Sequence, residues 1–105
     1  MVSNMTIEKV IDKARTYLHN EKNIEMIYKA YELAELKHRG QFRKSMDPYI
    51  QHPLEVAYML AELHTSPATI AAGLLHDLVE DTDVTKEEII AQFGEDVYNI
   101  VDGVT

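Results

Sequence analysis

Apolar residues recur along most of this chain at intervals of three and four positions, which is the spacing of one face of an α-helix. No segment alternates apolar and polar residues over the length of a strand. Short breaks divide the pattern into six expected helices, at residues 7–18, 24–39, 53–63, 67–81, 86–93 and 97–104. The sequence therefore predicts an all-α fold, a helical bundle with short connections.

Residues that start and end helices lie at the breaks in this pattern. The candidate N-caps are Thr6, Asn23, Ser66 and Thr85, whose side-chain oxygens can accept a backbone N–H. Glu88 follows Thr85 by three residues and completes a capping-box pattern. Gly40 and Gly94 are expected to end the second and fifth helices. Residues 40–51 have no helical period, and we expect them to form an ordered loop.

The composition of the chain excludes several kinds of functional site and partner. A chain of 105 residues is one small domain or part of one. It has no Cys, which excludes disulfides, Cys-ligated metals and a cysteine nucleophile. Residues 1–45 carry nine Lys/Arg and six Asp/Glu, whereas residues 46–105 carry one Lys and twelve Asp/Glu. Because binding of nucleic acid depends on many basic side chains that neutralise phosphates, nucleic acid is a poor partner for so acidic a chain. The longest apolar run, Ile70–Leu75, is too short to cross a membrane, and no signal peptide is present, so we expect a cytoplasmic protein.

Four polar residues mark the expected fourth helix as a candidate site. Within residues 70–79 the only polar side chains are His76 and Asp77, and burying a carboxylate is costly unless it is paired or coordinated. Glu80 and Asp81 follow them by four residues and would share their helix face. Such clustered carboxylates repel one another unless a cation or protons intervene. Two interpretations stay open, a His–Asp pair that only stabilises packing and a set of metal ligands.

His52 supplies a further candidate ligand, because it opens the third helix beside Pro53. Together with His76 and Asp77 it would form a mixed nitrogen and oxygen set, which suits Mn²⁺, Fe²⁺ or Zn²⁺. The remaining histidines lie near expected helix ends, where we expect surface or supporting groups: His19, His38 and His64.

The loop before the third helix carries positive charge, which complements the carboxylates of the candidate metal site. Arg39, Arg43 and Lys44 fall within six residues, with Gln41 and Ser45 as polar neighbours. This pattern is typical of a basic surface loop and also of an anion clamp, in which Arg binds phosphate with two parallel hydrogen bonds.

Residues 76–81, His-Asp-Leu-Val-Glu-Asp, resemble the His-Asp-x-x-Glu-Asp motif of HD-domain metallophosphohydrolases. Residues 38–45, 48–53 and the segments 93–95 and 101–105 resemble the hydrolase domain of the RelA/SpoT homologue family. That resemblance implies an HD-type bundle, of which residues 1–105 would be the N-terminal part. It also implies Mn²⁺-dependent hydrolysis of the 3′-pyrophosphate of (p)ppGpp to GDP or GTP and pyrophosphate. The setting it implies is a bifunctional, GTP pyrophosphokinase-like alarmone synthetase/hydrolase of the stringent response.

The resemblance also implies roles for individual residues. The metal ligands would be His52, His76 and Asp77, with a fourth ligand, an Asp, beyond residue 105. Glu80 and Asp81 would position or activate the attacking water. The guanine and the phosphates of ppGpp or pppGpp would be held by Arg43, Lys44 and Ser45. Met46 departs from the family pattern, which has Gly there; if the position needs a positive φ, Met strains or reshapes the loop.

Two other functions stay open. One is an HD phosphohydrolase that acts on another nucleotide, and the other is a non-catalytic helical regulatory module. Because a fourth ligand is expected beyond residue 105, we expect the isolated chain to be a weak or inactive hydrolase. The last helix should also present an uncovered apolar stripe that could support a homodimer, formed by Val97, Ile100, Val101 and Val104.

Overall fold

A computed structural model describes residues 5–103 of the protein, and all regular elements in this range are helices. They are α1 (Ile7–Arg15), α2 (Glu21–His38), α3 (Gln51–Glu62), α4 (Pro67–Leu75), α5 (Leu78–Asp81), α6 (Lys86–Phe93) and α7 (Glu95–Gly103). The all-α prediction is confirmed. The described residues contain one helix more than the six expected, because the predicted fourth helix divides into α4 and α5.

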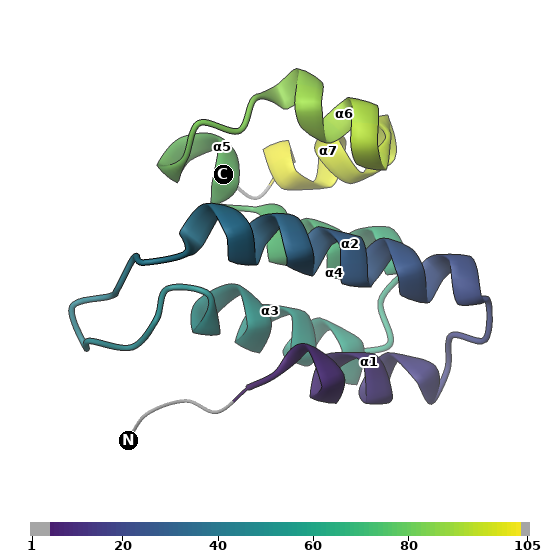
Figure 1. The fold of residues 1–105 in the computed structure, drawn as a ribbon. Coiled ribbons are helices and arrows are strands. Elements are labelled where there is room, and N and C mark those ends of the chain that lie inside the picture. The colour runs from purple at the N-terminus through teal and green to yellow at the C-terminus, as the bar shows by residue number, and fades with distance from the viewer. Residues whose placement is uncertain (1–4, 104–105) are drawn as a thin grey trace.

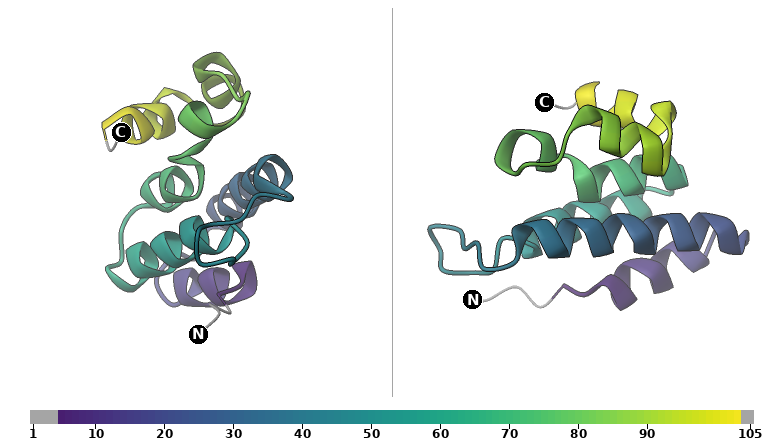
Figure 2. Two further views of the ribbon diagram at one scale, coloured as in Figure 1. Left: turned by 90° about the vertical axis from the view of Figure 1, so that its left-hand side faces the viewer. Right: turned by 45° about the horizontal axis from the view of Figure 1, so that its top comes forward.

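Helix α4 lies at the centre of the bundle and packs against α2, α3 and α7 (Figure 1). All six of its residues from 70 to 75 are buried, as expected for a helix that is apolar nearly all round. Helices α1 and α3 lie on one side of α2 and α4, and α6 and α7 lie on the other (Figure 2). No helix within residues 5–103 combines the length and the apolar character that a membrane span needs.

The predicted N-caps are confirmed at three helices and wrong at one. The hydroxyls that accept a backbone N–H, each at 3.2 Å, belong to Thr6, Ser66 and Thr85. Helix α2 begins three residues earlier than its apolar pattern, because Asn20 rather than Asn23 caps it and accepts from the N–H of Lys22 at 2.9 Å. Gly94, at φ 94°, separates α6 from α7, and α7 starts directly after it, at Glu95.

The division of the predicted fourth helix has a local cause. Nδ1 of His76 lies 2.6 Å from the carbonyl oxygen of Gly73 and donates to it. In a continuous helix that carbonyl would accept from the backbone N–H of Asp77. The side chain therefore competes with the helical hydrogen bond, and α4 ends at Leu75. His76 and Asp77 thus lie in a junction between two helices and not, as predicted, inside one.

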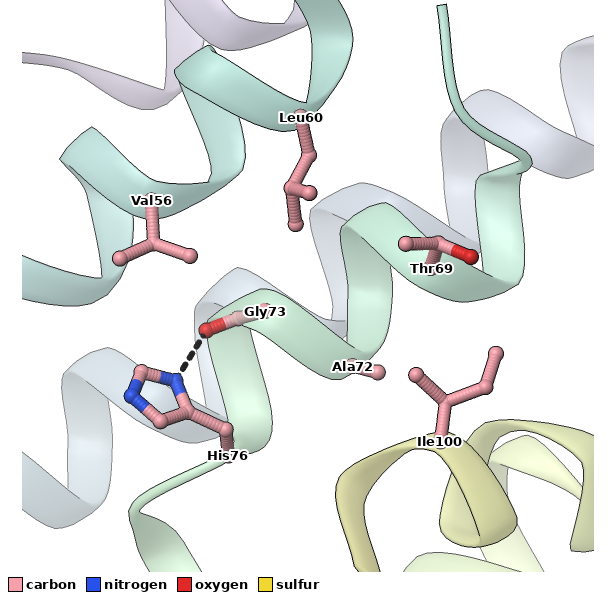
Figure 3. A pocket seen from close by; sticks show the side chains of 7 residues that line it. All are labelled: Val56, Leu60, Thr69, Ala72, Gly73, His76 and Ile100. Carbon is pink, nitrogen blue, oxygen red and sulfur yellow. Dashed lines mark hydrogen bonds between the residues drawn. The ribbon is translucent and has the colours of Figure 1, made fainter. Parts of the chain in front are cut away.

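The expected uncovered stripe on the last helix is wrong for two of its members. Val97 and Val101 are each only 1% exposed, because α7 packs on α4 and α6. Ile100 is partly exposed at the edge of an apolar hollow of about 270 Å³ between α3, α4 and α7 (Figure 3). Val104 lies outside the described residues. Two of the four residues on which the homodimer was predicted therefore offer it no exposed surface, and the homodimer itself stays a prediction.

Candidate metal centre and nucleotide loop

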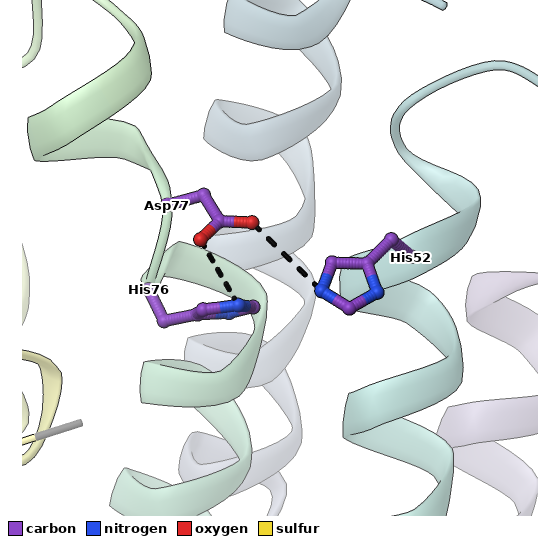
Figure 4. Close-up of side chains that lie close together, drawn as sticks. All are labelled: His52, His76 and Asp77. Carbon is purple, nitrogen blue, oxygen red and sulfur yellow. Dashed lines mark ion pairs between the residues drawn. The ribbon is translucent and has the colours of Figure 1, made fainter. Parts of the chain in front are cut away.

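Three segments that are distant in sequence meet at one end of the bundle. They are the loop between α2 and α3, the first turn of α3, and the junction between α4 and α5 (Figure 1). This arrangement brings together the three predicted metal ligands, His52, His76 and Asp77, with one donor atom from each lying within 4.8 Å of the others (Figure 4). The three residues lie together as predicted, and their binding of one divalent cation stays a prediction.

His76 is held with one ring nitrogen directed at Asp77. Because a carbonyl oxygen can only accept, the contact with Gly73 requires the proton to be on Nδ1. In the neutral ring the other nitrogen, Nε2, carries the lone pair that a metal would need, and it lies 3.1 Å from Oδ1 of Asp77. A backbone carbonyl that fixes the tautomer in this way is a common support of metal-binding histidines.

His52 approaches the same carboxylate from α3. Its Nε2 lies 3.9 Å from Oδ2 of Asp77, and its ring centroid lies 5.4 Å from that of His76. Burial lowers the pKa of His52 below its usual value, and the positive charge of Arg43 lowers it further. Since only a neutral imidazole can bind a metal, both effects favour the metal-binding form.

The donor set fits a divalent cation. Metal–nitrogen and metal–oxygen bonds of about 2.1 Å keep two donors on one ion within about 4.2 Å of each other. The donors of this site lie within 4.8 Å of one another, so side-chain shifts of under an ångström would close the set. Two imidazoles and one carboxylate suit a borderline ion such as Mn²⁺, Fe²⁺ or Zn²⁺. The three residues can therefore hold a divalent metal.

Of the predicted acidic pair, Asp81 lies at the rim of this centre. Glu80 and Asp81 are both exposed on α5. Asp81 and Asp77 share a neighbour, the hydroxyl of Tyr49, which lies 3.2 Å from Oδ2 of Asp81 and 2.9 Å from Oδ2 of Asp77. Burial and the two carboxylates raise the pKa of Tyr49 far above its usual value, so the hydroxyl keeps its proton and donates.

Tyr49 is a site residue that no sequence pattern singled out, and His38 packs against it. The ring of Tyr49 stacks on that of His38 at a centroid distance of 4.5 Å. His38, predicted to be a surface or supporting group, is only 2% exposed, while His19 and His64 are exposed. One signal was available, because Tyr49 precedes His52 by three residues at a helix start.

The loop presents three of its predicted anion-binding residues in one place. An open hollow of about 560 Å³ is lined by Phe42, Arg43, Lys44, Ser45 and Tyr49. Arg39 does not join them, because its guanidinium forms a 2.8 Å ion pair with Glu35. The loop is ordered by backbone bonds, from Arg43 N–H to the Asp47 carbonyl at 3.0 Å and from Met46 N–H to the Arg43 carbonyl at 2.8 Å. Met46 has φ 72°, so the position does require the left-handed conformation.

Comparison with known proteins identifies the class. The HD-domain family matches residues 30–105, and the chain therefore belongs to that family. Its relatives include a guanosine-3′,5′-bis(diphosphate) 3′-pyrophosphohydrolase of Spiroplasma citri, 44% identical over 100% of this chain and 14% of the relative. The corresponding protein of Aquifex aeolicus is 47% identical over 99% of this chain and 15% of the relative. A GTP pyrophosphokinase of Streptomyces coelicolor is 56% identical over 78% of this chain and 10% of the relative.

A solved structure agrees with these sequence relatives. A metazoan orthologue of SpoT, described as hydrolysing ppGpp and acting in starvation responses, superposes with a TM-score of 0.70 at 36% identity. The superposition covers 76% of this chain and 47% of that one. The chain spans about one seventh of the length of the two pyrophosphohydrolases that it matches. The family resemblance noted from the sequence is thereby confirmed.

Proposed function

We propose that this chain provides the metal centre and the nucleotide loop of a Mn²⁺-dependent hydrolase, which removes the 3′-pyrophosphate of ppGpp or pppGpp. The observation that carries the proposal is the convergence of His52, His76 and Asp77 beside the basic hollow of the loop. Similarity to proteins named for this reaction, over the whole chain in one case, supports the choice of substrate.

His52, His76 and Asp77 would hold the ion, with the fourth ligand, an Asp, contributed from beyond residue 105 as the family resemblance implies. A bound divalent ion supplies Lewis-acid chemistry, polarising a phosphoryl oxygen and lowering the pKa of a water. The protein's part is to keep a proton of His76 on Nδ1, through Gly73, and to favour the neutral imidazole of His52. The sulfur-free donor set supports a hard to borderline ion such as Mn²⁺.

The remaining residues would bind and orient the nucleotide. Arg43 and Lys44 offer exposed positive charge to the phosphates, and the hydroxyl of Ser45, which donates to Asp47 at 3.0 Å, would rotate to donate to a phosphate. Glu80 and Asp81, exposed on the short helix α5 that follows Asp77, would orient the attacking water and accept its proton. The products would be pyrophosphate and GDP, or GTP when the substrate is pppGpp.

Relatives named for ppGpp hydrolysis and relatives named for GTP pyrophosphokinase activity share this segment. We propose on this basis that the parent protein is a two-activity enzyme of the stringent response, in which the present residues serve the hydrolytic reaction.

The test is a hydrolysis assay on the longest natural form of the protein, with residues 1–105 alongside. ppGpp is incubated with Mn²⁺, with excess chelator, and with other nucleotides in its place, and released pyrophosphate and GDP are measured. Asp77→Asn removes one site carboxylate at nearly constant shape. Asp12→Asn, on the exposed face of α1, is the matched control.

We expect pyrophosphate release that needs Mn²⁺ and Asp77 and is indifferent to Asp12. Cleavage of another nucleotide but not of ppGpp would replace the proposal with a different HD phosphohydrolase. Metal binding without turnover of any nucleotide by the longest form would replace it with a regulatory module.

A further inference from the structure

One side chain, Tyr49, touches both halves of the candidate site. Its hydroxyl lies 2.9 Å from Oδ2 of Asp77 and 3.2 Å from Oδ2 of Asp81. Its ring lines the hollow that Arg43 and Lys44 border. The loop, the ligand carboxylate and the acidic rim therefore meet at a single residue.

Tyr49 is fixed at its ring and at its backbone. The ring stacks on that of His38, with centroids 4.5 Å apart and planes 27° apart. His38 is buried and is itself held by a contact of 3.1 Å between Nδ1 and Oε1 of Gln41. The backbone N–H of Tyr49 donates to the carbonyl of the same Gln41 at 2.9 Å. A phenol held in this way directs its O–H group at one acceptor.

That acceptor is the carboxylate of Asp77. Asp77 precedes α5, yet its side chain makes no hydrogen bond that caps the helix. Within residues 5–103 its other polar neighbours are the imidazoles of His52 and His76. Because Tyr49 holds Oδ2, the carboxylate is turned so that Oδ1 faces Nε2 of His76. The hydroxyl therefore contributes a directed hydrogen bond that helps to fix this rotation.

A phenol has one proton, so it cannot donate to both carboxylates at once. The shorter distance assigns the proton to Asp77, and Asp81 then faces the hydroxyl oxygen at 3.2 Å. Two carboxylates around one donor leave an excess of negative charge that a cation would relieve. Asp81 thus lies beside the cation site, where a bound cation would attract it.

We propose that Tyr49 is a positioning residue, which orients Asp77 for metal binding and links the metal centre to the nucleotide loop. The metal-binding part stands on the geometry of the three ligands, and only the link to the nucleotide rests on the proposed function.

Tyr49→Phe tests this role because it keeps the ring and its stacking on His38 and removes the hydroxyl alone. Tyr17→Phe is a matched control. Tyr17 also stacks on a histidine, His64, at 4.3 Å, and its hydroxyl donates to the Thr65 carbonyl at 2.7 Å, but it lies outside the metal centre. Mn²⁺ is titrated into each variant and followed by electron paramagnetic resonance of the free ion, and circular dichroism verifies folding.

Loss of a group that supports a metal ligand lowers metal affinity by about 10–100-fold, and we expect a loss of that size for Tyr49→Phe. Tyr17→Phe should bind Mn²⁺ as the wild type does. Equal affinity for Mn²⁺ in folded Tyr49→Phe and wild type would overturn the proposal, whether or not ppGpp proves to be the substrate.

A measurement on the unsubstituted chain covers the case in which Tyr49→Phe does not fold. With tyrosines labelled at Cζ by carbon-13, a titration with diamagnetic Zn²⁺ should shift the assigned resonance of Tyr49 and leave that of Tyr17 in place. A resonance of Tyr49 that stays unchanged while the metal binds would refute the contact.

Discussion

Met46 offers a direct test of strain in the nucleotide loop. It has φ 72°, in the left-handed region, and its side chain is 77% exposed. An L-residue in this region is disfavoured by about 1–2 kcal/mol, because its Cβ crowds the backbone. Glycine avoids that crowding but loses roughly 0.5–1 kcal/mol of extra conformational entropy on folding. Met46→Gly should therefore increase the free energy of unfolding by about 0.5–1 kcal/mol, which raises the melting temperature by about 2–8 °C.

Thermal unfolding of the metal-free chain, followed by far-ultraviolet circular dichroism, measures this difference. Met46→Ala is the control, because it removes the same exposed side chain and keeps the Cβ that causes the strain. Its melting temperature should stay within about 4 °C of the wild type, since exposed substitutions change stability by roughly 0.5 kcal/mol or less. A melting temperature of Met46→Gly no higher than that of Met46→Ala would show that the loop stores no such strain.

Three further outcomes follow from the site. Arg43→Ala should weaken ppGpp binding, measured by calorimetry, by about 1.5–3 kcal/mol, which is the value of one charge-assisted hydrogen bond. The melting temperature should not change, because Arg43 is exposed. A large loss of stability with unaltered binding would show that Arg43 has a structural role. Glu80→Gln should retain Mn²⁺ binding and reduce ppGpp hydrolysis by roughly 10²–10⁴-fold, as loss of a general base does, whereas loss of the metal would make Glu80 a ligand. The folded chain lowers the pKa of His52, so below about pH 6.5 the unfolded chain binds a proton that the folded chain resists. Metal-free stability should thus fall as the pH drops through this window, and His52→Gln should make that fall smaller; an identical pH profile would contradict the assignment.

Local signals predicted the parts of the fold that depend on neighbouring residues. A hydroxyl directly before an apolar run is enough to cap a helix, and this held at Thr6, Ser66 and Thr85. The same signal could not choose between Asn20 and Asn23, because both can accept a backbone N–H and the choice depends on how α1 connects to α2. The continuous apolar run also hid the break after Leu75.

That break depends on the orientation of a single ring. Nδ1 of His76 donates a hydrogen bond to the carbonyl of Gly73, and the other ring nitrogen points to the metal centre. One contact therefore both ends α4 and orients a metal ligand. Residue types alone indicated that His76 and Asp77 needed a partner, but they could not show a helix junction.

The contacts of Tyr49 could not be predicted from the spacing of apolar residues, for a different reason. It lies 28 residues from Asp77 and 32 from Asp81, and the loop must fold back before the three can meet. The burial of His38 has the same origin, since Tyr49 covers it. Contacts made by an irregular loop depend on its path, which the pattern of apolar positions does not encode.

The measurement that tests the account most directly is a Mn²⁺ titration of the chain and of His76→Ala. His19→Ala, which removes an exposed histidine outside the centre, is the control. If His52, His76 and Asp77 hold one ion, the wild type and His19→Ala bind one equivalent of Mn²⁺ with the same affinity, and His76→Ala binds far more weakly. Equal binding of Mn²⁺ by the wild type and His76→Ala would contradict the metal centre on which the proposed reaction depends.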